Sequence, residues 1–346
     1  TIGTIEGATV NMESTGADLN IDNTINATTG GVTLVAETDI DTAAAAATVT
    51  GANAVTMTAD GNITLADTAT ATDGTLTITA DADDSGAGDV AATAALEGDD
   101  VVISGVNIAT DDVTADDGDV TMIADASIDT TNAGAATVQA TNDVTMNAGT
   151  TIAVDNVTAT NGSVALDAAN GGITINGDVS ALLNVLISGN SITQAAGEDL
   201  LAGGWLSLIA DVTDIVLNGT IGNGAAIGGD IDITAANDVT VNDDVTGNAD
   251  LTIEAGNDAV FAANGDLLTN GTGSISVTAD ADSNLTGVLT MADGTVFNAD
   301  TGTLDLSAAG TVTLGSVTTT NATEDAVSVT STTADIVDGG VTADEI

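Results

Sequence analysis

One short pattern of hydrophobic and polar residues repeats along most of the chain. An apolar residue, a polar residue and a second apolar residue stand in a row, usually next to Gly, Asn or Asp. The pattern returns every 19 to 29 residues, on average about every 23, which is a period typical of solenoids. The first residues of the fourteen triplets are Val32, Val55, Leu76, Val101, Val120, Val144, Val164, Val185, Leu206, Ile231, Leu251, Ile275, Leu304 and Val327.

Each triplet predicts a short strand. Its two apolar side chains point to the same face, because side chains alternate between the faces of a strand. A second triplet often begins eight residues after the first, as Ile63 does after Val55 and Val312 after Leu304. A third apolar position, such as Val157, often follows five or six residues later. We therefore expect a roughly triangular coil of three strands, with length variation gathered after the third strand.

The predicted fold class is all-β: a parallel β-helix (β-solenoid) of about 14 rungs of about 23 residues. The absence of Pro favours strands that donate hydrogen bonds to rungs on both sides. A β-sandwich or an up-and-down barrel also alternates, but neither accounts for in-phase repeats. We predict one continuous array over residues 1–346, and we allow for irregular terminal segments at 1–30 and 330–346. The run Ala43–Ala47 is a short helix candidate.

Charge narrows the range of partners. The chain has no Lys, Arg or His and 52 acidic residues, so its formal net charge is −52. Nucleic acid and anionic membrane surfaces are excluded as partners because no side chain can neutralise a phosphate. No apolar stretch of about 20 residues is present, so we expect no direct membrane insertion. No signal peptide is recognisable at Thr1, and we expect it to have been removed or to lie outside this sequence.

The repeats resemble the passenger regions of filamentous-haemagglutinin-like adhesins and autotransporters of bacteria. The segments that carry the resemblance are Asn142–Gly149 (NDVTMNAG) and Gly302–Gly310 (GTLDLSAAG). The resemblance implies a right-handed parallel β-helix on the cell surface of a prokaryote. This chain departs from that family in having no Lys or Arg, and its lack of the secretion and membrane domains suggests an internal segment. The composition, rich in Thr, Ala, Gly and Asp, also resembles that of bacterial S-layer proteins.

Two segments resemble the start of a calcium-binding loop, in which alternate oxygen atoms converge on one cation. The first is Asp81–Asp89 (DADDSGAGD), and the weaker second, Asp280–Asn284, has Leu285 where Gly is expected. The usual Glu at the twelfth position is absent, since Ala92 stands there, and solvated corner residues explain these Asp equally well. The predicted Ca²⁺ ligands are Asp81, Asp83, Ser85, Asp89, Asp280, Asp282 and Asn284.

Catalysis has few residue types to work with, because the chain lacks His, Lys, Arg, Cys and Tyr. We expect no enzyme, and a carboxylate-based glycoside hydrolase is a distant alternative. Trp205 follows two glycines at a strand triplet, and we expect it to fill the core.

The function expected is that of an extracellular structural or adhesive rod, either a stalk segment or a subunit that associates with itself end to end. Cell-surface glycans are a second class of partner. A calcium-dependent S-layer or glycan-binding module is the alternative.

Overall fold

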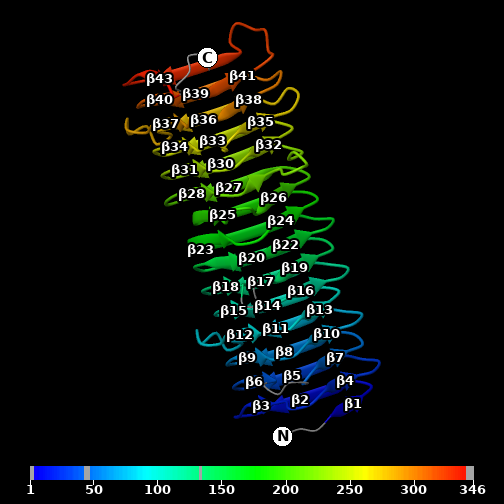
Figure 1. The fold of residues 1–346 in the computed structure, drawn as a ribbon. Coiled ribbons are helices and arrows are strands. Elements are labelled where there is room, and N and C mark those ends of the chain that lie inside the picture. Colours follow the sequence, from blue (N-terminus) through cyan, green and yellow to red (C-terminus); the bar gives the residue numbers. More distant parts are fainter. Residues whose placement is uncertain (1–3, 43–46, 132–134, 340–346) are drawn as a thin grey trace. The chain divides into compact units, whose positions relative to one another are not determined.

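The computed structural model describes residues 4–42, 47–131 and 135–339, so most of the helix candidate Ala43–Ala47 lies outside the described residues. Strands but no helices occur within these ranges, and parallel ladders of short strands make a β-solenoid, as predicted (Figure 1). Contacts divide the chain into two compact units, Thr1–Asn170 and Gly171–Ile346, which are described separately.

In the first unit each coil contributes one strand to each of three parallel ladders. The ladder of long strands contains β2 (Val10–Ser14), β5 (Val32–Ala36), β8 (Val55–Ala59), β11 (Leu76–Thr79), β14 (Val101–Gly105), β17 (Val120–Ala124), β20 (Val144–Ala148) and the first part of β23 (Val164–Ile175). The second ladder contains β3 (Leu19–Asn20), β6 (Ile40–Thr42), β9 (Ile63–Leu65), β12 (Val90–Ala92), β15 (Ile108–Ala109), β18 (Ile128–Asp129) and β21 (Ile152–Val154). The third contains β1 (Ile5–Gly7), β4 (Ile25–Ala27), β7 (Val49–Gly51), β10 (Ala69–Ala71), β13 (Leu96–Gly98), β16 (Val113–Ala115), β19 (Thr137–Ala140) and β22 (Asn156–Ala159).

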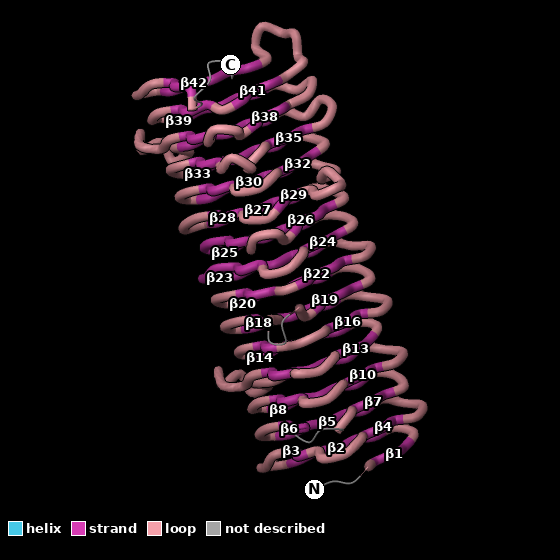
Figure 2. Tube along the Cα trace, in the orientation of Figure 1, coloured by secondary structure: helices cyan, strands magenta, loops and turns pink. Residues whose placement is uncertain are grey.

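The second unit repeats this arrangement (Figure 2). Its long strands are β25 (Val185–Gln194), β27 (Leu206–Ala210), β30 (Ile231–Ala235), β33 (Leu251–Ala255), β36 (Ile275–Ala279), β39 (Leu304–Ala308) and β42 (Val327–Ser331). Its second ladder continues from the end of β25 through β28 (Ile215–Leu217), β31 (Val239–Val241), β34 (Ala259–Phe261), β37 (Leu289–Met291), β40 (Val312–Leu314) and β43 (Ile336–Asp338). The third contains β24 (Val179–Ala181), β26 (Asp199–Ala202), β29 (Thr220–Ile221), β32 (Val245–Gly247), β35 (Leu267–Thr269), β38 (Val296–Asn298) and β41 (Ser316–Thr318).

The inward residues account for this stacking. In β8, Val55, Met57 and Ala59 are buried, and the Thr residues between them are half-buried. Val55 pairs in register with Val32 on one side and Leu76 on the other, so aliphatic side chains of successive coils form columns. The register is strongly specified, because a slip of one residue would turn every apolar side chain outward. The fourteen predicted triplets all begin long strands, and β2 adds a fifteenth coil.

The positions of the insertions differ in part from the prediction, because they follow the first strand of a coil as well as the third. Two long connections follow the first strand of a coil: the one between β11 and β12 has ten residues and the one between β36 and β37 has nine. A connection after the third strand is also long between β29 and β30. The reason is that any corner of a coil can be extended outward without disturbing the three ladders.

The aromatic residues occupy two different environments. Phe261 and Phe297 lie fully buried in the second unit, with their ring centroids 4.7 Å apart at an interplanar angle of 81°. The expectation that Trp205 fills the core is wrong, because 41% of its surface is exposed. It lies just before β27 at a corner, outside the alternation that directs side chains inward.

Candidate functional site

The first predicted calcium loop is an insertion at the corner between β11 and β12. Leu76 and Val90 begin these strands and are separated by 14 positions, whereas Val55 and Ile63 begin the corresponding strands of the preceding coil 8 positions apart. The additional residues make a loop that lies outside the ladders. This loop borders a hollow lined also by residues of β14 and β17, among them Ser104.

The Asp81 carboxylate organises the loop. The backbone turns through left-handed conformations at Asp81, Asp84 and Gly86, with φ values of 56°, 58° and 77°. Asp81 Oδ1 accepts the N–H groups of Ser85 at 2.9 Å, Gly86 at 3.1 Å and Ala87 at 3.3 Å, and the Ser85 hydroxyl at 2.9 Å. Lost hydration raises the pKa of Asp81, but these hydrogen bonds outweigh it and hold the pKa below the ordinary 3.8.

The other predicted ligands of this loop have different partners. Asp83 Oδ1 accepts the Ser85 N–H at 3.2 Å. Asp89 Oδ1 accepts the backbone N–H and the side-chain amide of Asn107 at 3.1 and 2.9 Å, so it is bonded to the next coil. The structure therefore places Asp81, Asp83 and Ser85 together within the loop, and places Asp89 in the corner that follows it.

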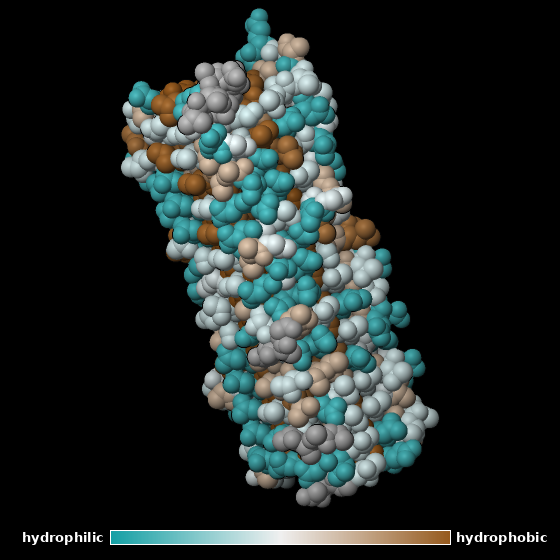
Figure 3. All heavy atoms as spheres, in the orientation of Figure 1, coloured by the Kyte–Doolittle hydropathy of each residue, from teal (hydrophilic) through white to brown (hydrophobic). Residues whose placement is uncertain are grey.

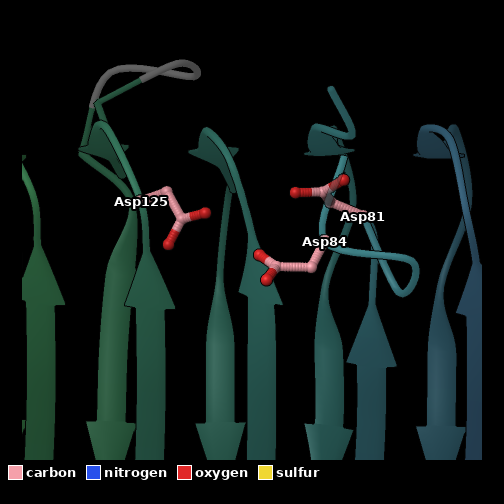
Figure 4. Close-up of side chains that lie close together, drawn as sticks. All are labelled: Asp81, Asp84 and Asp125. Atoms are coloured by element: carbon pink, nitrogen blue, oxygen red, sulfur yellow. The ribbon is translucent and has the colours of Figure 1, made fainter. Parts of the chain in front are cut away.

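A different set of carboxylates converges. Oxygen atoms of Asp81, Asp84 and Asp125 all lie within 4.8 Å of one another, and Figure 4 shows them meeting beside the loop. Asp125 directly follows β17, which lies two coils from β11 in the ladder β11–β14–β17. Carboxylate oxygens are the ligands that hard cations such as Ca²⁺ take. These three residues, the acidic trio, are the candidate metal centre of the first unit.

Sequence reasoning missed Asp84 and Asp125 as candidate ligands. The calcium-loop pattern assigns ligands to alternate positions of the loop, and Asp84 is not one of them. Asp125 lies 41 residues from Asp84 and so falls outside any local pattern. A signal for Asp125 was nevertheless present. Asp81 and Asp125 each follow a buried alanine, Ala80 and Ala124, at the same place in their coils. Alignment of the coils would have put both carboxylates on the same corner.

The second predicted loop, which begins at Asp280–Asn284, has left-handed residues at the same spacing but not the trio. Its left-handed residues are Asp280, Ser283 and Leu285, with φ values of 67°, 61° and 71°. Asp280 Oδ1 accepts the Leu285 N–H at 2.8 Å, as Asp81 does for its own loop. Asp282 accepts both the backbone and side-chain N–H groups of Asn284, at 3.1 and 2.8 Å. Its hollow is lined by Ser283 and Thr332 at the places of Asp84 and Asp125.

Many corner carboxylates accept hydrogen bonds from backbone N–H groups. Asp100, Asp119 and Asp143 stand one coil apart, and each accepts the backbone N–H of the residue at the same place in the next coil, at 3.0, 3.0 and 2.7 Å. In the second unit Asp214 and Asp238 do the same, at 3.1 and 3.0 Å. Asp is thus abundant at corners because it satisfies backbone donors as well as being hydrated.

The stacking of Asp residues at the corners of successive coils brings like charges close together. Burial first, and then the charges of Asp117, Asp73, Asp100 and Asp116, raise the pKa of Asp99. Burial and neighbouring carboxylates, in that order, also raise the pKa values of Asp111, Asp232 and Asp244. No cationic side chain in the protein can offset this repulsion, so at neutral pH it is screened by cations from solution.

Comparisons with known proteins give no relative: no family model, no curated protein and no solved structure matches the chain. In the part of the chain that the structure describes, no helix has the length and apolar character needed to cross a membrane.

Proposed function

We propose that this protein is a non-enzymatic structural or adhesive rod on the outside of a prokaryotic cell, similar in role to the filamentous-haemagglutinin-like passenger regions. The observation that carries the proposal is the in-register stacking within each unit. A coil contacts chiefly the coils next to it, so a stack lengthens by about 4.8 Å for each coil without a change of cross-section. Such a fold provides length, which is what a stalk or fibre requires.

The surface chemistry supports an exposed, saline setting. Fifty-two carboxylates and no basic side chain leave trypsin-like proteases without a cleavage site. Many corner carboxylates accept backbone N–H groups, so part of this charge is also needed for the fold. Self-repulsion is screened where salt or divalent cations are abundant.

End-to-end association of copies is the assembly that we propose. Val327 and Ile336, in the last described coil, are 43% and 47% exposed, whereas their counterparts one coil earlier, Leu304 and Val312, are fully buried. Another coil stacked on this surface would cover these apolar groups and pair with the strands β42 and β43. A head-to-tail contact of this kind generates open filaments.

Imaging and scattering of the 346-residue chain test the proposal. A single rod of fifteen coils should be about 70 Å long, and filaments should be whole multiples of that length. Samples in EDTA and in Ca²⁺ are compared at matched ionic strength, since screening alone favours contact. A compact sphere in scattering would contradict the rod. Monomers in both samples would refute self-association while leaving the stalk segment in place.

A calcium-dependent surface-layer or glycan-binding module is the second candidate, and the acidic trio favours it. Three carboxylate oxygens lie within 4.8 Å of one another and come from two different coils. A cation held there would link the loop between β11 and β12 to the end of β17. Such a link would stabilise the folded state by mass action. Calorimetric titration with Ca²⁺ distinguishes this module from a rod that only needs screening.

A further inference from the structure

Trp205 stands where neighbouring coils carry short polar residues. It precedes β27 at the corner that holds Asn184 in the preceding coil and Asp230 and Asp250 in the next two. Its backbone N–H donates to Asn184 Oδ1 at 3.1 Å, so its main chain keeps the corner pattern while its indole is 41% exposed. The only Trp of the chain is therefore held at the surface by a regular, hydrogen-bonded backbone.

Two exposed leucines stand one coil earlier, next to the glycines that precede Trp205. Leu182 and Leu183, in the preceding coil, are 56% and 49% exposed, and the Gly204 N–H donates to the Leu183 carbonyl. A Cβ atom added to Gly203 would lie 2.0 Å from the Leu182 carbonyl oxygen, so the close approach of the two coils requires glycine there. Gly203 and Gly204 have no side chains, so nothing from that part of the coil covers Leu182 and Leu183. We call Leu182, Leu183 and Trp205 together the Trp205 patch. Figure 3 shows that hydrophobic groups form scattered clusters among hydrophilic and intermediate residues on the face in view.

Carboxylates border the patch. The next coil places Asp230 beside Trp205, and Asp232 pairs in register with Ser207. Asp230 Oδ1 accepts the Asp250 N–H at 3.3 Å, so a third carboxylate follows in the same corner. Burial, and then the charges of Asp230 and Asp250, raise the pKa of Asp232. The region therefore combines exposed apolar surface with unneutralised negative charge.

We propose that the Trp205 patch docks a basic amphipathic segment of another protein, independently of the rod function. Leucine side chains of the partner would cover Leu182 and Leu183, and its Lys or Arg groups would meet the Asp230 carboxylate and the face of the indole. A second copy of this chain cannot supply that charge, since it has no cationic side chain. Because the patch is small, it belongs to the class of weak, transient interfaces.

Intrinsic fluorescence reports this site alone, because the chain has one Trp and no Tyr. The probe is a synthetic amphipathic peptide of Leu and Lys, without aromatic residues. Its control is a peptide of equal length and charge in which Ser replaces Leu. At physiological salt we expect the Leu–Lys peptide to shift Trp205 emission to shorter wavelength and to saturate. The Ser–Lys peptide should leave the emission unchanged, since diffuse attraction to a polyanion is screened.

Variants then locate the contact through the anisotropy of a labelled Leu–Lys peptide. Leu182→Ser together with Leu183→Ser should weaken binding about tenfold or more, the effect of losing a central apolar anchor. Asp230→Asn should weaken it several-fold and reduce its salt dependence. Val212→Ser is the matched control, because Val212 is 58% exposed in the same unit but outside the patch, and it should bind as the parent protein does. Circular dichroism confirms that each variant is folded.

Three results would overturn the proposal. Absence of an emission shift with the Leu–Lys peptide is one. Equal binding of the Ser–Lys peptide, or of the double leucine variant, would show diffuse charge attraction only. A saturable shift with neutral oligosaccharides and none with the peptide would make the patch a sugar site.

Discussion

Replacing Met122 by Asp should destabilise the first unit far more than the same replacement at Thr121. The two residues are neighbours in β17, but their side chains point to opposite faces. Met122 is fully buried between Ile103 and Met146 of the adjacent coils, whereas Thr121 faces outward and is half-buried. Both substitutions add one carboxylate to a chain of net charge −52, so their difference reports burial.

The magnitude follows from two losses. Removing a buried Met side chain costs about 2 to 5 kcal/mol in lost transfer energy and residual cavity. An uncompensated buried charge costs about 3 to 5 kcal/mol more. No cationic side chain exists in the protein to pair with the new carboxylate. The expected loss is therefore about 5 to 10 kcal/mol at Met122, against about 1 kcal/mol or less at Thr121.

Urea unfolding followed by far-ultraviolet circular dichroism measures both variants. Trp205 fluorescence adds a second probe, because this residue lies in the other unit. Since coils stabilise mainly their neighbours, the Met122→Asp variant should lose dichroism at lower urea while the fluorescence transition moves less. Equal midpoints for Met122→Asp and Thr121→Asp would refute the inward assignment of Met122. A fluorescence transition that follows the dichroism fully would refute local stacking as the source of stability.

Three further predictions concern the carboxylates. Asp84→Ser together with Asp125→Thr gives the first loop the residues that the second loop has at the matching positions. This double variant should show no Ca²⁺ binding in calorimetry at millimolar concentration. Binding equal to that of the parent protein would exclude the acidic trio as the site. Asp119→Ala should lower the free energy of unfolding by about 1 kcal/mol, because the Asp143 N–H loses its acceptor. Asp119→Asn keeps an acceptor and should leave this free energy unchanged or raise it. Equal effects of the two substitutions in chemical unfolding would show that the hydrogen bond does not contribute to stability. A folded-state pKa above 3.8 makes an Asp destabilising at pH 7, and that penalty fades as the pH falls through the raised pKa toward 3.8. Asp81, whose pKa is lowered, contributes stability that is lost as the pH falls below 3.8. In low salt the thermal midpoint should therefore rise as the pH falls from neutral toward 3.8 and then fall at lower pH; a midpoint that falls throughout would contradict the raised pKa values of Asp99, Asp111, Asp232 and Asp244.

The repeat was readable from the chain because strand stacking imposes a local rule. Inward residues such as Val55 and Met57 must be apolar and two positions apart, and this requirement returns in every coil. The spacing of eight residues between Val55 and Ile63 was equally visible, because one corner has one preferred length. Parallel register then followed from aligning the coils, as the pairing of Val55 with Val32 and Leu76 confirms.

The lengths of the corners and the directions of their side chains could not be predicted in the same way, because no alternation of buried and exposed residues constrains them. The loop between β11 and β12 lies outside the ladders, so its length and position were free to differ from the prediction. Trp205 was expected inside because it is large and apolar, but its place one residue before β27 directs it outward.

The sequence by itself determined the class of fold and the residues of the core, and its net charge of −52 is the reason to expect no anionic partner. These depend on periodicity and charge, which are properties of the chain read in order. Only the tertiary structure decided which carboxylates meet. Asp84 and Asp125 are 41 positions apart in the chain, and the stacking of coils brings their oxygen atoms within 4.8 Å of each other. The tertiary structure likewise brought Leu182 against Gly203, two residues before Trp205, because residues at the same corner of successive coils are about one repeat apart in sequence.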